Sequence, residues 1–179
     1  MARGKDSSDG GGAVLFVLIV LIWFVIKFIW WIVGALALVA GSVSAQTLKG
    51  IKVVDLSAVV SGPMAAGILA DQGADVIKVE TQGGDLTRVI GPAVGDLTSL
   101  FISINRGKRC IVLDLKQAEG ARVLRDLIAN ADVLVENFRT GTLDRWGLSA
   151  ATLFAANPRL IIVRVTGFGQ TGPERSRPG

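Results

Sequence analysis

Short β-branched strands alternate with helices from residue 51 onward, and this alternation restricts the possible folds more than any other feature of the chain. The apolar run 51–56 leads through a turn into a helix that Gly62 and Pro63 begin, and a second strand follows at 75–80. A separation of about 25 residues from strand to strand suits the crossover between two parallel strands. Three further strands are predicted on the same grounds, at 109–115, 132–136 and 160–165. Because several of these strands are apolar throughout, the sequence predicts an α/β fold, a Rossmann-like parallel sheet with flanking helices.

Three helices are expected between these strands. The first runs through small and apolar residues to Ala70, the second covers 116–131 with apolar positions at helical spacing, and the third runs from a Ser149 cap to Ala156. In open parallel sheets, ligands bind beyond the carboxyl ends of the strands. We therefore expect one common rim for the loops that begin at Ser57, Glu80, Lys116, Asn137 and Thr166.

The first part of the chain has a different composition. Residues 13–40 form an apolar stretch of 28 residues in which Lys27 is the only charge. At ~1.5 Å per residue, a helix of that length exceeds the ~30 Å hydrocarbon core of a bilayer. We therefore expect a polar leader over 1–12, a transmembrane helix over 13–40, a linker over 41–47 and a globular domain over 48–179. The lipid bilayer is thus an expected partner, and the expected location is a membrane that the chain crosses once.

Two alternatives remain open for this segment. One is a signal peptide cleaved near Ala45, after the small residues Val43 and Ser44, and the other is an unrelated leader. Signal peptides carry apolar regions of only ~7–15 residues, which favours a retained helix. Two positive residues flank the apolar stretch on each side, so the charges do not set its orientation.

The scarcity of histidine and cysteine limits the chemistry. The chain has no histidine and one cysteine, which excludes Ser-His-Asp and Cys-His catalysis and argues against a zinc site, so no metal is predicted. Cys110 lies in the apolar run 110–113 and is predicted to be a buried small hydrophobic residue. The net charge of +4 is too small to indicate nucleic acid as a partner. The Gly-x-Gly-x-x-Gly pattern at 167–172 lacks the helix and the acidic residue of a dinucleotide site.

A series of motifs follows in a fixed order along nearly all of residues 47–179. They include Ser61-Gly-Pro63, Gly73–Glu80, Gly84-Asp85, Asn105–Arg109, Leu113–Lys116, Ala131–Phe138, Gly147-Leu148, Asn157–Leu160 and Gly167–Pro173. In order and spacing the series resembles family III CoA-transferases, the superfamily of formyl-CoA transferase, carnitine CoA-transferase and α-methylacyl-CoA racemase. The resemblance implies transfer of CoA between an acyl-CoA and a carboxylic acid, with acyl-racemase chemistry as an alternative. It also implies acyl-CoA as substrate, no covalently bound cofactor, and a homodimer of interlocked chains.

The resemblance also implies a set of CoA contacts. The positions that match those of formyl-CoA transferase are Val59, Leu113, Lys116, Asn137, Phe138, Arg145 and Phe168. Lys116 and Arg145 would offer cations to the phosphates of CoA. Without the resemblance, solvated surface charge is the favoured interpretation of both residues. Phe138 would offer an apolar face to adenine.

Three departures from formyl-CoA transferase bear on specificity. Val60 stands in place of a glutamine near the thioester, Thr81 in place of an arginine and Thr166 in place of a lysine. Specificity for formyl or oxalyl groups is therefore not implied.

The catalytic residue of the family is an aspartate that follows the glycine-rich loop, so its position is expected beyond Gly179. No catalytic residue is therefore assigned, and we expect no turnover from this chain alone. A second polypeptide could supply the nucleophile; alternatively, the chain is a membrane-anchored acyl-CoA-binding module or the remnant of a gene fusion. Because CoA is cytosolic, the domain over 48–179 is expected to face the cytoplasm.

Overall fold

The computed structural model describes residues 23, 25–33, 46–95 and 97–177 of the 179-residue chain. The chain divides into two units, Met1–Ser44 and Ala45–Gly179. The expected boundaries at residues 12, 40 and 47 stay predictions.

In the first unit, residues 23 and 25–33 are helical, and their side chains are exposed. The Lys27 ammonium lies 5.3 Å from the centre of the Trp23 ring, and the rings of Phe28 and Trp31 stack at 6.3 Å. Most of the transmembrane helix expected over 13–40 falls outside the described residues. Within the described ones, no helix combines the length and the apolar character needed to cross a bilayer. The membrane span therefore remains a prediction that the structure does not support.

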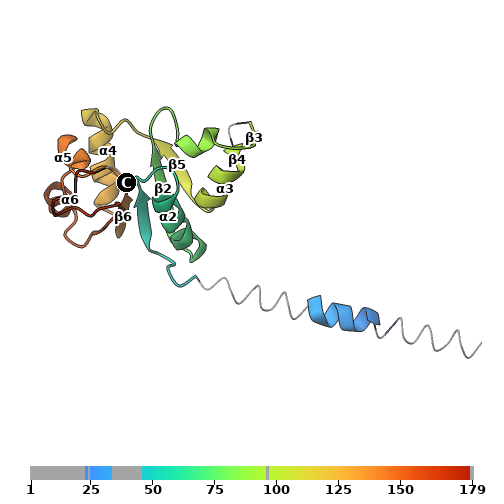
Figure 1. Cartoon of the computed structure of the whole chain (residues 1–179). Helices are drawn as coiled ribbons and strands as arrows, with labels where there is room; N and C mark the ends of the chain where they lie inside the picture. The colour runs from blue at the N-terminus through green and yellow to red at the C-terminus, as the bar shows by residue number, and fades with distance from the viewer. Residues whose placement is uncertain (1–22, 24, 34–45, 96, 178–179) are drawn as a thin grey trace, which may run out of the picture. The chain divides into compact units, whose positions relative to one another are not determined.

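The second unit is built on a parallel sheet of five strands in the order β5-β2-β1-β6-β7 (Figure 1). The strands are β1 (Lys52–Asp55), β2 (Asp75–Glu80), β5 (Arg109–Val112), β6 (Val133–Glu136) and β7 (Ile161–Arg164). The registers place Val54 of the central strand β1 beside Ile77 on one side and Leu134 on the other. The parallel α/β sheet predicted from the sequence is confirmed.

Helices cover both faces of this sheet. They are α2 (Ser61–Asp71), α3 (Ser99–Asn105), α4 (Ala118–Ile128), α5 (Thr142–Arg145) and α6 (Ala150–Ala156). Side chains that follow one another along a strand point to opposite faces, so Val53 packs with Ala66 of α2 whereas Val54 packs in the cluster that holds Leu124 of α4 and Leu153 of α6. β1 is therefore held between two buried apolar layers, one on each face of the sheet.

The segment between β2 and β5 is structured along much of its length. It contains the 3₁₀ helix η1 (Leu86–Val89), the antiparallel pair β3 (Ala93–Val94) and β4 (Leu97–Thr98), and then α3. The Thr98 hydroxyl accepts the Phe101 N–H at 3.0 Å and so caps α3. This segment places Asp85 next to the loop that follows β1.

The prediction that Cys110 is buried is wrong: this cysteine is exposed. The reason is the place of β5 at an edge of the described sheet, where Val112 is also 60% exposed. The opposite edge strand β7 is similar, with Ile161 59% exposed. An apolar strand sequence indicates a buried strand, but it does not tell whether that strand has a neighbour on both sides.

Candidate functional site

The carboxyl ends of β1 and β6 form the topological switch point of the sheet. The chain goes outward from β1 through β2 to β5, and then crosses back to place β6 on the other side of β1. The loops that follow β1 and β6 therefore leave in opposite directions, and a crevice opens where they diverge. Ligands of open α/β sheets bind at such crevices.

Asn137, directly after β6, joins these two loops. Its Oδ1 accepts the Ala58 N–H at 2.9 Å and its Nδ2 donates to the Ala58 carbonyl at 2.8 Å. The backbone N–H and the carbonyl of Ala58 are thus both bound by one side chain, which lies 79 positions further along the chain.

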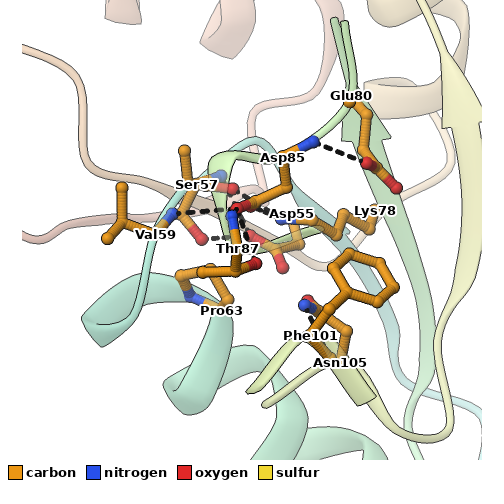
Figure 2. Close-up of polar contacts among 12 residues, drawn as sticks. Asp55, Ser57, Val59, Pro63, Lys78, Glu80, Asp85, Thr87, Phe101 and Asn105 are labelled. Atoms are coloured by element: carbon orange, nitrogen blue, oxygen red, sulfur yellow. Dashed lines mark hydrogen bonds and ion pairs between the residues drawn. The ribbon is translucent and has the colours of Figure 1, made fainter. Parts of the chain in front are cut away.

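Two more side chains hold the residues on either side of Ala58. The Lys78 ammonium, on β2, donates to the Ser57 carbonyl at 2.8 Å, and the Val59 N–H donates to Asp85 Oδ1 at 3.4 Å. We call residues 57–59 with these contacts the β1 loop clamp. Figure 2 shows Lys78 and Asp85 beside Ser57 and Val59 of this loop. Three consecutive residues are therefore fixed by side chains from three different segments.

The clamp holds Val59 in an uncommon conformation. Its φ is +68°, and it is the one non-glycine residue with positive φ among those that the structure describes. A β-branched residue is seldom found there because its side chain crowds the backbone. The first turn of α2 also comes close, since a Cβ added to Gly62 would lie 2.3 Å from the Ser57 Cβ. The loop is therefore set by the surrounding structure and not by its own preference.

Two buried ion pairs lie under the clamp. Lys78 Nζ lies 2.8 Å from Asp85 Oδ2, and Lys108 Nζ lies 2.8 Å from Asp55 Oδ2, with side chains at most 1% exposed. Asp55 also accepts the backbone N–H and the hydroxyl of Ser57. Charges removed from water are costly unless each is paired and hydrogen-bonded, as these are.

Burial and pairing act in opposite directions on the pKa of Asp85 and on that of Lys108. Burial alone would raise the pKa of the Asp85 carboxyl, but hydrogen bonds from Lys78 and Thr87 hold that pKa below its ordinary value. Burial lowers the pKa of Lys108, against the opposing charge of Asp55. Each ion pair belongs to a hydrogen-bonded network that also fixes backbone groups at the end of β1.

A second acidic residue, Glu80 at the end of β2, binds the backbone of Asp85. Glu80 Oε2 accepts the Asp85 N–H at 2.8 Å, and both of its oxygens bind Arg88, at 2.7 and 2.6 Å. Although burial would raise it, the bonds from Arg88 and Asp85 lower the pKa of Glu80.

Glu136, at the end of β6, has a different environment. Its carboxylate accepts the Phe138 N–H at 2.7 Å and lies 3.2 Å from Arg164 Nε. Burial outweighs both partners and raises the pKa of this carboxyl. The described residues contain no group of acidic, cysteine or histidine side chains that could hold a metal ion.

Two open pockets flank the switch point. The first, which we call the β5-side pocket, includes Thr81, Leu113, Lys116, Phe138 and Trp146 in its lining. The second, the β7-side pocket, includes Val59, Asn137, Phe138, Arg139, Thr166, Phe168, Arg175 and Arg177. Phe138 lines both pockets, and its ring packs edge-on against Trp146 at 5.2 Å.

Six of the seven residues proposed from the sequence lie at these pockets. Leu113 and Lys116 line the β5-side pocket, Val59, Asn137 and Phe168 line the β7-side pocket, and Phe138 lines both. Arg145 lines neither: it is exposed on α5 and donates to the Thr142 hydroxyl at 2.9 Å. Its neighbour Trp146 lines the β5-side pocket instead.

Sequence reasoning missed the charged network and three arginines of the β7-side pocket. One signal was present, since Lys78 and Glu80 interrupt the apolar strand 75–80 at alternate positions. Charged residues inside a strand that is otherwise buried indicate a paired network or a site.

Comparison with known proteins identifies relatives of this domain. The family model described as CoA-transferase family III matches residues 48–179. The succinyl-CoA–L-malate CoA-transferase β subunit of Chloroflexus aurantiacus is 50% identical over 141 residues, which cover 78% of this chain and 35% of that protein. The human succinyl-CoA:glutarate CoA-transferase is 42% identical over 75% of this chain and 31% of its own length.

A solved structure agrees with these relatives. A CAIB/BAIF family protein from Brucella suis is 47% identical and superposes with a TM-score of 0.70, over 74% of this chain and 36% of that one. The chain spans about a third of the length of the curated relatives that it matches.

Proposed function

Because the chain belongs to CoA-transferase family III, we propose that its domain binds the CoA part of an acyl-CoA across the switch point and serves the transfer of CoA between an acyl-CoA and a carboxylic acid. The named activities of the relatives, which move CoA between succinyl-CoA and L-malate or glutarate, support this reaction class.

One observation carries the placement of CoA: Phe138 forms a wall of both pockets. A long ligand can therefore pass over Phe138 with one end in each pocket. The β5-side pocket combines the apolar side chains of Leu113 and Trp146 with the exposed ammonium of Lys116, which suits an adenine ring beside phosphates. The thioester end of the ligand then lies in the β7-side pocket.

The β1 loop clamp would shape the passage between the two ends. Its residues carry backbone groups past the switch point, and Val59 itself lines the β7-side pocket. Because the clamp is tied to two buried ion pairs, the loop needs little reordering when a ligand binds, which favours affinity.

None of the buried carboxylates at the rim is proposed as a nucleophile. Asp55 and Asp85 are held by lysines, and Glu136 is held by Arg164 and the Phe138 N–H. Two of the relatives are named as α and β subunits of one transferase, which supports the proposal that this domain acts within a larger assembly.

Calorimetric titration of the whole chain with CoA tests the proposal. We expect Phe138→Ala to weaken CoA binding at least about tenfold and Lys116→Gln about three- to tenfold, because the first removes a shared wall and the second a cation. The matched control is Lys49→Gln, an exposed lysine in the segment before β1. Failure to bind CoA, or equal binding by all three variants, would contradict the proposal.

A further inference from the structure

The β7-side pocket is strongly basic. Arg139, in the loop after β6, and Arg175 and Arg177, beyond β7, contribute to its lining, and no acidic residue among those that the structure describes does so. The β5-side pocket differs, because it is lined by Glu80, Asp85 and Asp114 as well as by Lys78 and Lys116. The two ends of the proposed CoA site thus have different charge.

Counting only the described residues, two of the three guanidinium groups have no acidic partner. Arg177 is 3.0 Å from Glu174 and lies over the Phe168 ring at 4.6 Å, so it is already engaged. Within the described part of the chain, neither Arg139 nor Arg175 forms an ion pair with an acidic side chain, and both are exposed at the pocket. Unpaired guanidinium groups on one concave surface form a site for an anion.

The position of the site indicates which anion. If the adenosine and phosphates of CoA occupy the β5-side pocket, the acyl group is the part of the ligand that reaches the β7-side pocket. The acyl carbonyl of a thioester carries no charge, so an anionic group of the bound acyl-CoA in this pocket belongs to the far end of the acyl group. A carboxylate fits the planar fork of a guanidinium with two parallel hydrogen bonds.

We propose that Arg139 and Arg175 bind a carboxylate at the far end of the acyl group, so that this site prefers acyl groups derived from dicarboxylic acids. The inference rests on the proposed function, because it needs the acyl end of CoA in the β7-side pocket. It assigns specificity to two residues that matched none of the positions expected to contact CoA.

The test compares succinyl-CoA with butyryl-CoA by calorimetric titration of the whole chain. The two ligands share the CoA part and a four-carbon acyl chain, and they differ in the terminal carboxylate. We expect succinyl-CoA to bind about tenfold more tightly at low salt, and this ratio to shrink as salt is added, because the arginines are solvent-exposed. Arg139→Gln and Arg175→Gln should each reduce the ratio, and the double variant should bring it close to one.

The matched control is Arg159→Gln, an exposed arginine just before β7 and thus at the opposite end of the strands, which should leave the ratio as it is. A wild-type ratio of one would overturn the inference and leave the proposed function standing. So would arginine variants that weaken CoA, butyryl-CoA and succinyl-CoA by the same factor, since the arginines would then bind CoA phosphates. If the chain binds none of the three ligands, both proposals fail.

Discussion

At the scale of single residues, the end of β1 is held in place by its neighbours. Val59 keeps a φ of +68° although valine avoids that region, and Ala58 and Ser57 beside it are bound by Asn137 and Lys78. Backbone strain of this kind persists where the surroundings over-determine the conformation, and it is often found at binding sites.

This strain gives a direct prediction at Val59. We expect Val59→Gly to be more stable than Val59→Ala by about 1 kcal/mol, because glycine adopts positive φ without steric cost and alanine does not. At an ordinary position the order is reversed, since alanine loses less entropy on folding. Urea unfolding of the two variants measures the difference, and a more stable alanine variant would show that Val59 is not strained.

The pKa shifts of Asp85, which belongs to the β1 loop clamp, and of Glu80, which binds Asp85, predict how stability depends on pH. Hydrogen bonds hold the pKa of Asp85 and of Glu80 below their ordinary values of 3.8 and 4.5, in spite of burial. A carboxyl whose pKa is lower in the folded state stabilises the fold above its unfolded pKa, and that stabilisation is lost as the pH falls through the folded pKa. We therefore expect the free energy of unfolding to decrease below about pH 4.5.

Asp85→Asn provides the comparison for this pH dependence. At pH 7 this variant should be less stable by about 3–5 kcal/mol, because it leaves Lys78 buried without its counter-charge. Below pH 4.5 its stability should fall less steeply than that of the wild type, because one of the titrating groups is gone. Parallel pH profiles for the two proteins would mean that Asp85 does not contribute in this way.

At the scale of the elements, the hydrophobic pattern of the sequence predicted the sheet well. The strand expected at 75–80 matches β2 residue for residue, and the Ser149 cap is confirmed by the bond from the Thr152 N–H at 3.2 Å. The helix α3 was missed because residues 99–105 mix polar, aromatic and β-branched side chains without a clear period. It is fixed by tertiary contacts, such as Arg88 lying 3.7 Å over the Phe101 ring.

The approach of α2 to the β1 loop gives a prediction at this scale. Gly62→Ala improves the helix propensity of α2 but places a Cβ 2.3 Å from the Ser57 Cβ, so we expect a net loss of stability of about 1–3 kcal/mol together with weaker CoA binding. Gly83→Ala is the control, because a Cβ there meets no atom within 4 Å and the residue does not have positive φ. Calorimetric melting and CoA titration of both variants provide the measurements, and a Gly62→Ala protein that matches the Gly83→Ala protein would contradict this account of the loop.

At the scale of the whole molecule, the sequence indicated the family and the rim of the sheet, but it could not indicate which charged side chains pair or gather within that rim. The motifs at 131–138 and 167–173 lie on one edge because the strands that precede them are parallel, which follows from the strand–helix alternation. The pairing of Lys78 with Asp85 and of Lys108 with Asp55 depends on which strands become neighbours and on the path of the segment between β2 and β5. The arginines of the β7-side pocket come together only once β6 and β7 lie side by side.

The central claim is that CoA binds at the carboxyl rim of the sheet, across the point where β1 and β6 diverge. Hydrogen–deuterium exchange of the whole chain with and without CoA tests it most directly, because it reports on every segment at once. We predict slower exchange in residues 57–60, 113–116, 137–139 and 166–169, with no change at the opposite rim, in residues 106–108, 130–132 and 157–160. Protection at the opposite rim, or none at residues 57–60 and 137–139 when CoA is saturating, would contradict the account.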